Sequence, residues 1–299
     1  MDWKDKLLWG DCKEIVATLP DNCVDCVVTS PPYWNLRDYE VEGQLGLEDS
    51  YLDYISNLCD LFDEIKRVLK PEGSVFVIIG DTYYGSTKTK INNATKLSPR
   101  TLTMIPARFG IEMLNRGWII PNKLIWHKPN IMPRPCKKRF IVNYEEIFFF
   151  VKQEHYYFQT QYEPFATPNL GDLKVSVGDK YKDENVKVEN KSIQKFYNKV
   201  KDGEVEGRIM RSVWKVAVSN NGCFHKAPYP EQLIVPILNA VCPPNGIVLD
   251  PFMGTGTTAI VALKQDKHFI GIDLDNRAIE YAQNRINSYL EQTTIFSHI

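Results

Sequence analysis

The stretch that decides the fold is Ile247-Val248-Leu249-Asp250-Pro251-Phe252-Met253-Gly254-Thr255-Gly256-Thr257-Thr258. It joins an apolar strand to a glycine-rich turn and then to the start of a helix. The two glycines allow backbone conformations closed to other residues and let the chain approach a ligand closely. The next apolar run ends in Gly271-Ile272-Asp273, where a nucleoside-binding fold places the acidic residue that accepts hydrogen bonds from ribose hydroxyls. This order predicts one half of a nucleoside-binding α/β sheet.

The glycine turn indicates a nucleoside ligand without phosphates. It lacks the third glycine of the dinucleotide fingerprint and the Gly-Lys-Ser/Thr of a phosphate loop. S-adenosylmethionine, which joins adenosine to a sulfonium amino acid, is such a ligand, and we expect it as the cofactor. A tight strand-to-helix turn that binds no ligand is the alternative.

Strands and helices alternate along the rest of the chain. Apolar runs predict strands, and apolar residues at helical spacing predict helices. Strands are expected over 6–9, 24–29, 74–80, 117–126, 145–151, 246–249 and 268–272, and helices over 12–19, over 51–69, up to about 263 and from 276 onwards. This alternation predicts a doubly wound, mostly parallel α/β sheet.

A second motif, Ser30-Pro31-Pro32-Tyr33, follows the strand that ends at Thr29. Open α/β sheets place their sites at such carboxyl ends. The prolines hold the backbone rigid and remove two amide donors, so that nearby carbonyls are available as acceptors. If the Ser30 oxygen and the Pro31 carbonyl accept the protons of an aromatic amine, its nitrogen becomes pyramidal and can attack a sulfonium methyl, while Tyr33 stacks on the base. On its own, the tetrapeptide also fits a plain turn.

The composition is that of an ordinary globular protein, with 43% hydrophobic and 24% charged residues among 299. The net charge of −1 neither indicates nor excludes nucleic-acid binding, because the local distribution of charge decides it. The charged start lacks the apolar core of a signal peptide, and no apolar run reaches the ~20 residues of a membrane span, so we expect a cytoplasmic protein with reduced thiols. Cys23 and Cys26 lead into an apolar strand without a second pair, so we expect buried structural cysteines there, not metal ligands.

Two segments are basic and polar. The segment from Thr160 to Arg211 is rich in lysine, shows no period and interleaves the aromatic residues Tyr181, Phe196 and Tyr197. Composition alone favours a solvated insertion there. The loop from Thr82 to Arg100 follows a strand on the expected side of the site and either closes over DNA or is plain solvated loop.

Taken in this order, the two motifs resemble the amino-methylating DNA methyltransferases of restriction–modification systems. The match is to the β class, in which the catalytic motif precedes the cofactor motif. Further matching segments are Gly10-Asp11, Leu36-Arg37-Asp38-Tyr39, Trp126-His127-Lys128-Pro129-Asn130, Tyr144-Glu145-Glu146-Ile147 and the element from His225 to Leu233. The resemblance covers nearly the whole chain except Thr160 to Arg211, where the family keeps its target-recognition region. It implies a circularly permuted, seven-stranded Rossmann-like sheet, with a catalytic part at 1–159, a target-recognition insertion at 160–212 and a cofactor-binding part at 213–299.

The resemblance also implies roles for individual residues. The expected catalytic residues are Ser30, Pro31, Pro32 and Tyr33. The expected cofactor contacts are Asp11, Thr29, His225, Pro228, Asp250, Pro251, Phe252, Gly254, Gly256, Thr257 and Asp273. The expected DNA contacts are Lys88, Lys90, Arg100, Arg134, Lys191, Lys195, Arg208 and Arg211, with the aromatic residues of the insertion available for stacking. No metal is expected.

The expected reaction is methyl transfer from S-adenosylmethionine to the N4 amine of a flipped cytosine in double-stranded DNA. Serine as the first motif residue resembles the cytosine enzymes, and adenine N6 remains the alternative. Cys136 lacks the sequence context of a carbon-5 cytosine enzyme. A glutamine methyltransferase acting on proteins and a non-catalytic DNA-binding module are two further alternatives. A cognate restriction endonuclease is expected as a separate protein, and the oligomeric state stays open.

Overall fold

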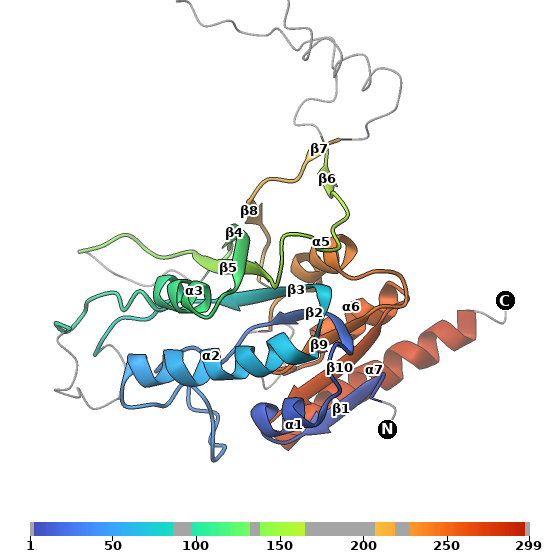
Figure 1. Ribbon diagram of the computed structural model, residues 1–299, viewed down its shortest axis with the longest axis horizontal. Coiled ribbons are helices and arrows are strands. Elements are labelled where there is room, and N and C mark those ends of the chain that lie inside the picture. Colours follow the sequence, from blue (N-terminus) through green and yellow to red (C-terminus); the bar gives the residue numbers. More distant parts are fainter. Residues whose placement is uncertain (1–2, 86–96, 132–137, 165–206, 219–227, 297–299) are drawn as a thin grey trace, which may run out of the picture. The chain divides into compact units, whose positions relative to one another are not determined.

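The computed structural model describes residues 3–85, 97–131, 138–164, 207–218 and 228–296 (Figure 1). The chain divides into two compact units. The first comprises Met1–Gln159 and Ser212–Ile299 and carries the main sheet, and the second is Thr160–Arg211.

The main sheet has eight strands in the order β1-β10-β9-β2-β3-β5-β4-β8. The first five run parallel, β5 is antiparallel to both of its neighbours, and β8 is parallel to β4. The doubly wound, mostly parallel sheet is therefore confirmed. It has one strand more than the expected seven, because the short β8 pairs with the outer edge of β4. The bounds are β1 (Lys6–Trp9), β2 (Val24–Thr29), β3 (Leu69–Ile79), β4 (Ile119–His127), β5 (Tyr144–Val151), β8 (Val213–Lys215), β9 (Ile247–Asp250) and β10 (His268–Asp273).

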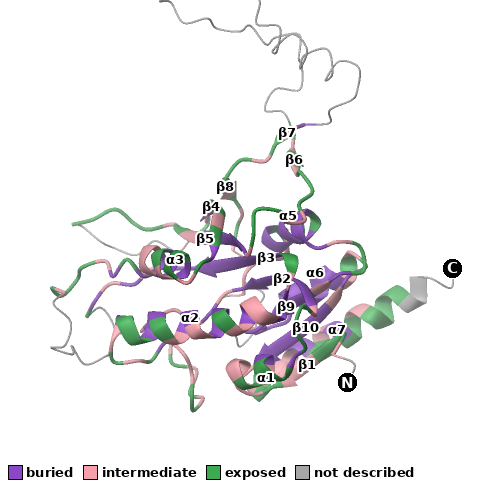
Figure 2. Cartoon of the chain, in the orientation of Figure 1, coloured by how far each residue is buried: buried purple, intermediate pink, exposed green. Residues whose placement is uncertain are grey.

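Helices cover both faces of this sheet, and each face has its own apolar core (Figures 1 and 2). Because side chains alternate along a strand, β3 sends Val75 and Val77 to one core and Phe76 and Ile78 to the other. The first core is closed by α1 (Cys12–Thr18), α2 (Tyr51–Val68) and α3 (Ile105–Asn115). The second is closed by α5 (Glu231–Val241), α6 (Thr257–Lys264) and α7 (Asn276–Phe296).

The strands β2 and β9 are neighbours at the centre of the sheet, with Cys26 opposite Val248 and Val27 opposite Leu249. From β2 the chain continues through α2 to β3, on one side of this pair. From β9 it continues through α6 to β10, on the other side. The carboxyl ends of β2 and β9 therefore form the topological switch point, where open α/β sheets bind their ligands.

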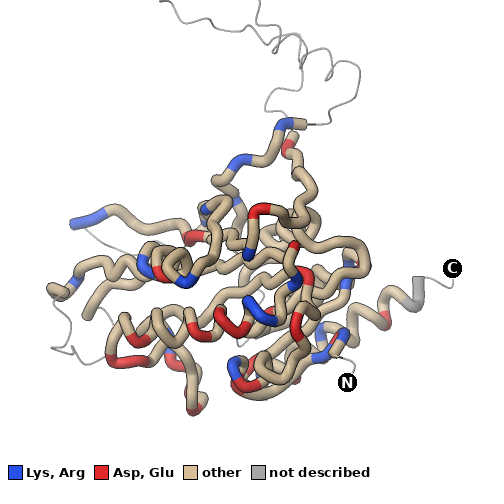
Figure 3. The backbone as a smooth tube through the Cα atoms, in the orientation of Figure 1, with Lys and Arg blue, Asp and Glu red and all other residues tan. Residues whose placement is uncertain are grey.

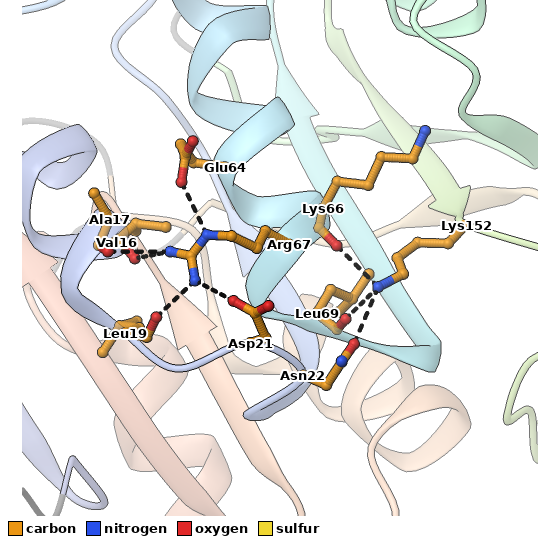
Figure 4. A network of polar contacts seen from close by, with 10 residues as sticks. All are labelled: Val16, Ala17, Leu19, Asp21, Asn22, Glu64, Lys66, Arg67, Leu69 and Lys152. Atoms are coloured by element: carbon orange, nitrogen blue, oxygen red, sulfur yellow. Dashed lines mark hydrogen bonds and ion pairs between the residues drawn. The ribbon is translucent and has the colours of Figure 1, made fainter.

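At the other end of these strands, Arg67 and Lys152 hold α1, α2 and β5 together (Figure 4). The Arg67 guanidinium pairs with Asp21 and Glu64 and donates to the last carbonyls of α1, at Val16, Ala17 and Leu19. The Lys152 ammonium, just beyond β5, donates to the Lys66 and Leu69 carbonyls. These bonds give donors to carbonyls at and just beyond the ends of α1 and α2.

The described part of the second unit is a two-stranded antiparallel ladder of β6 (Tyr162–Glu163) and β7 (Arg208–Ile209). One carboxylate oxygen of Glu163 accepts from Arg208 at 2.8 Å and from Arg211 at 3.0 Å. Within the described ranges, Cys26 is fully buried and Cys23 half-buried, and neither forms a disulfide. Across those same ranges, no helix combines the length and the apolar character that crossing a membrane requires.

Candidate functional site

The two sequence motifs meet at the switch point, where a side-chain hydrogen bond joins the ends of β2 and β9. The Thr29 hydroxyl, at the end of β2, donates to Oδ1 of Asp250, at the end of β9, over 2.7 Å. These residues are 221 positions apart in the chain. The bond brings the start of the Ser-Pro-Pro-Tyr loop against the start of the glycine turn.

The Asp250 carboxylate is the centre of a wider network. Its other oxygen accepts from the Tyr229 hydroxyl at 2.6 Å and from the Thr258 hydroxyl at 2.7 Å, and the Phe252 amide donates to Oδ1 at 3.1 Å. Asp250 is fully buried, and burial raises its pKa while these donors act against the rise. The Asp250 side chain is completely enclosed by protein atoms, and the cofactor contact expected for it stays a prediction. It joins β2, β9, α6 and the segment before α5.

The glycine turn uses its two glycines differently. Gly254 has a φ of 53°, and its amide donates to Oδ2 of Asp273 over 2.7 Å. Gly256 has a φ of 79°, and a Cβ there would lie 2.9 Å from the Cβ of Ala282. Gly256 therefore lets α6 start close against α7, which is a packing role. Of the other expected contacts in the turn, Pro251 and Thr257 are buried and Phe252 is half-buried.

Two carboxylates lie at the ends of the neighbouring strands β10 and β1. Asp273 accepts from the Gly254 amide and from the Asp275 amide, one on each oxygen. Burial raises the pKa of Asp273 to about 6, and the two amide donors oppose this rise. Asp11 caps α1, because its Oδ1 accepts from the amides of Lys13 and Glu14 at 2.7 and 3.2 Å.

The Ser-Pro-Pro-Tyr loop leads into a chain of polar groups. The Ser30 hydroxyl donates to the Tyr33 hydroxyl at 3.4 Å, and Tyr33 donates to Oε2 of Glu145 at 2.7 Å. The other oxygen of Glu145 pairs with the Lys128 ammonium, which lies 4.1 Å from the centre of the Trp126 ring. The bond to Glu145 fixes the phenol end of Tyr33 on β5.

The ring of Tyr33 rests on Gly80, which follows β3. A Cβ on Gly80 would lie 2.6 Å from Cε2 of Tyr33, so only glycine leaves room for the ring in this position. The Pro32 carbonyl accepts from the Tyr54 hydroxyl at 2.9 Å, and the buried Trp34 donates to the Glu48 carbonyl at 2.9 Å. These contacts hold the loop from both α2 and the core.

Some site residues were not assigned from the sequence. Glu145 and Lys128 lie in segments that carry the family resemblance, but the sequence predicts no role for either. Glu145 contacts Tyr33 from 112 residues away in the chain, and Lys128 pairs with Glu145. Tyr229 lies within the noted element from His225 to Leu233, and its hydroxyl becomes a donor only because β9 ends beside it. Gly80 carried no local signal.

The remaining expected contacts are only partly described. Pro228 is half-buried and directly precedes Tyr229, and Arg100 is exposed, with its amide bonded to the Tyr84 carbonyl at 2.7 Å. Arg208 and Arg211 pair with Glu163. The expected contacts His225, Lys88, Lys90, Arg134, Lys191 and Lys195 lie outside the described residues.

Known proteins are similar to this chain in sequence and in fold. Residues 24–284 match the N6_N4_Mtase family, described as DNA methylase. Type II methyltransferase M.Cfr9I of Citrobacter freundii is 32% identical, over 94% of this chain and 87% of that protein. Type II methyltransferase M.SmaI of Serratia marcescens is 31% identical, over 94% and 90%.

Two solved structures show the same fold at lower identity. PvuII DNA methyltransferase (cytosine-N4-specific) superimposes with a TM-score of 0.65 at 18% identity, covering 93% of this chain and 84% of that one. The M1.HpyAVI–SAM complex superimposes with a TM-score of 0.57 at 17% identity, covering 94% and 98%.

Proposed function

The chain belongs to the DNA methylase family, and we propose that it transfers a methyl group from S-adenosylmethionine to the N4 amine of cytosine in double-stranded DNA. The observation that carries the proposal is the Thr29–Asp250 hydrogen bond. It holds the acceptor loop and the glycine turn at one switch point, so an amine and a methyl donor can meet there. Its type II relatives suggest that the methylation protects a restriction site against a separate endonuclease.

The residues of the turn fit S-adenosylmethionine better than a nucleotide. No Lys or Arg stands between Asp250 and Thr258 to neutralise phosphates. The Asp273 carboxylate, at the edge of the turn, is the acceptor for ribose hydroxyls, and bonds from them would favour its charged form. The buried Asp250 carboxylate supports the turn by accepting from the Phe252 amide.

The protein contributes alignment and hydrogen-bond acceptors. Bound S-adenosylmethionine supplies an electrophilic methyl group. Ser30 donates its own proton towards Tyr33, which leaves the lone pairs of its oxygen to accept from the target amine. The Pro31 carbonyl accepts the second amine proton. Glu145 is a positioning residue, because it accepts a hydrogen bond from the Tyr33 hydroxyl. This bond sets the direction of the Tyr33 and Ser30 hydroxyls.

Serine at position 30 favours cytosine as the target base. At this position the adenine enzymes of the family more often carry a carboxylate, where this chain has a neutral hydroxyl. The PvuII enzyme, which has a similar fold, is cytosine-N4-specific by its name. Adenine N6 is the second candidate, because the family includes both reactions.

The test is incubation of plasmid DNA with isotopically labelled S-adenosylmethionine, followed by mass analysis of the nucleosides and mapping of the modified site. We expect labelled N4-methylcytosine at one sequence. Labelled N6-methyladenine would transfer the assignment to the second candidate. Label in the protein alone, or none in DNA, would contradict the proposal.

A further inference from the structure

A short segment before β5 exposes three apolar side chains in a row. Phe140 is 98% exposed, Ile141 46% and Val142 45%, and Figure 2 shows this segment as an exposed arm. Three consecutive exposed apolar residues are unfavourable on a soluble surface unless they serve a function. We therefore expect these three side chains to contact a binding partner.

The arm is anchored at both ends. The Arg139 guanidinium lies 3.5 Å from the centre of the Tyr83 ring, and the Lys128 amide donates to the Asn143 carbonyl at 2.8 Å. Lys128 also pairs with Glu145, which holds Tyr33. The arm thus rises from the same edge of the sheet as the Ser-Pro-Pro-Tyr loop.

The positive charge around the arm favours a polyanion as its binding partner. Lys138 and Arg139 directly precede Phe140 and are exposed, and Figure 3 shows Lys and Arg at the start of this segment. Arg100 is exposed on the adjoining loop, whose backbone bonds to Tyr84, next to Tyr83. Cations that flank an exposed aromatic ring suit a duplex, with phosphates for the cations and stacked bases for the ring.

We infer that Phe140 inserts into the base stack of the DNA and fills the space that the flipped target base leaves. This inference rests on the proposed function, because only an enzyme that extrudes a base creates such a space. Ile141 and Val142 then cover the apolar edge of the opened step, while Lys138 and Arg139 contact the flanking phosphates.

The experiment uses the full chain and a synthetic duplex that contains the mapped site. Phe140→Ala should lower kcat/KM at least ~10-fold on the fully paired duplex, whereas Phe140→Trp should retain most activity because it can still stack. An abasic position opposite the target base makes flipping cheap, so Phe140→Ala should regain near wild-type activity on that duplex. The matched control is Ile111→Ala, which removes an exposed apolar side chain from α3.

Binding is read independently with 2-aminopurine at the target position. The wild type should raise its fluorescence and Phe140→Ala should not, with equal S-adenosylmethionine affinity by calorimetry. Equal losses on paired and abasic duplexes, or full activity of Phe140→Ala, would overturn the inference while leaving the methyltransferase assignment intact. A change in sedimentation confined to Phe140→Ala would reassign the arm to pairing between two copies. A wild type that modifies no DNA would overturn both proposals.

Discussion

The direction of one hydroxyl carries much of the chemistry proposed for Ser30. Its oxygen must accept from the target amine, and its proton is already directed at Tyr33. We expect Ser30→Ala to lower kcat on the order of 10²-fold, the usual effect of removing one preorganised polar contact, with little change in S-adenosylmethionine affinity. Single-turnover methylation and calorimetry measure the two quantities. Ser288→Ala, on the exposed face of α7, is the matched control, and equal losses in both assays would contradict the role.

Glu145 acts on the same chemistry through Tyr33. Glu145→Ala and Tyr33→Phe each remove the 2.7 Å bond between them, so each should lower kcat about 10-fold with little change in KM. The double variant should lose no more than either single variant, because both remove the same contact. Glu146→Ala, next along β5 and paired with Lys123, is the control. Additive losses in the double-mutant cycle would show that the two residues act independently.

The raised pKa of Asp273 predicts a pH dependence of cofactor binding. Burial is the main cause of its value of about 6, and the nearby carboxylates of Asp250 and Asp275 raise it further. Ribose hydroxyls that donate to Asp273 favour the charged form, so the bound state has the lower pKa. Affinity should therefore be full above about pH 6, fall as the pH drops below it, and be accompanied there by proton release.

Calorimetry at about pH 5 and about pH 8, in two buffers of different ionisation enthalpy, measures both the affinity and the proton release. Asp273→Asn should weaken binding at the higher pH and flatten the dependence, whereas Asp266→Asn, in a loop before β10, should change neither. A pH-independent affinity in the wild type would remove Asp273 from the cofactor site.

At the scale of elements, the hydrogen bond between β2 and β9 is also a stability feature. Thr29→Val keeps the shape of the side chain but leaves the buried Asp250 carboxylate with one donor fewer. We expect a loss of about 1–3 kcal/mol in the free energy of unfolding, because a buried charged acceptor loses a partner. Urea denaturation measures it. Thr29→Ser retains the hydroxyl and should lose less, and equal losses would assign the effect to packing.

The elements that the sequence predicted are those with strong local signals. Buried parallel strands read as apolar runs, so β2, β9 and β10 were expected within one residue of their bounds. The helices α3 and α5 were not predicted. The first follows Met104, which has left-handed backbone and makes no side-chain cap, and the second contains Pro236. Tertiary packing, not local propensity, makes both of them helical.

At the scale of the whole molecule, the order of motifs was predictable and their contacts were not. The resemblance of two distant motifs was enough to expect that they meet. The role of an individual residue within the site depends on which other side chains contact it. Asp250 proved to be enclosed by Tyr229 and Thr258, and Tyr33 proved to be bonded to Glu145. No local pattern in the sequence contains that information.

Because Thr160–Arg211 forms a compact unit of its own, its removal can test whether cofactor binding and DNA recognition depend on different parts of the chain. Within this unit the Met210 amide donates to the Gln161 carbonyl at 2.9 Å, so a short glycine-rich turn can replace residues 162–209 without moving these ends. Neither apolar core of the first unit includes a described residue of this segment.

We therefore expect the shortened protein to unfold cooperatively and to bind S-adenosylmethionine with wild-type affinity. Its methylation of DNA at the mapped site should fall at least ~100-fold, and the salt dependence of DNA binding should become shallower, because the lysines of the segment and Arg208, which we propose as phosphate contacts, are removed. Calorimetry, labelled methyl transfer and binding at several salt concentrations measure the three quantities. A control that keeps the full length but replaces the eight lysines of the segment with glutamine separates charge from shape. Full DNA methylation by the shortened protein would assign target recognition to the loops of the main sheet instead.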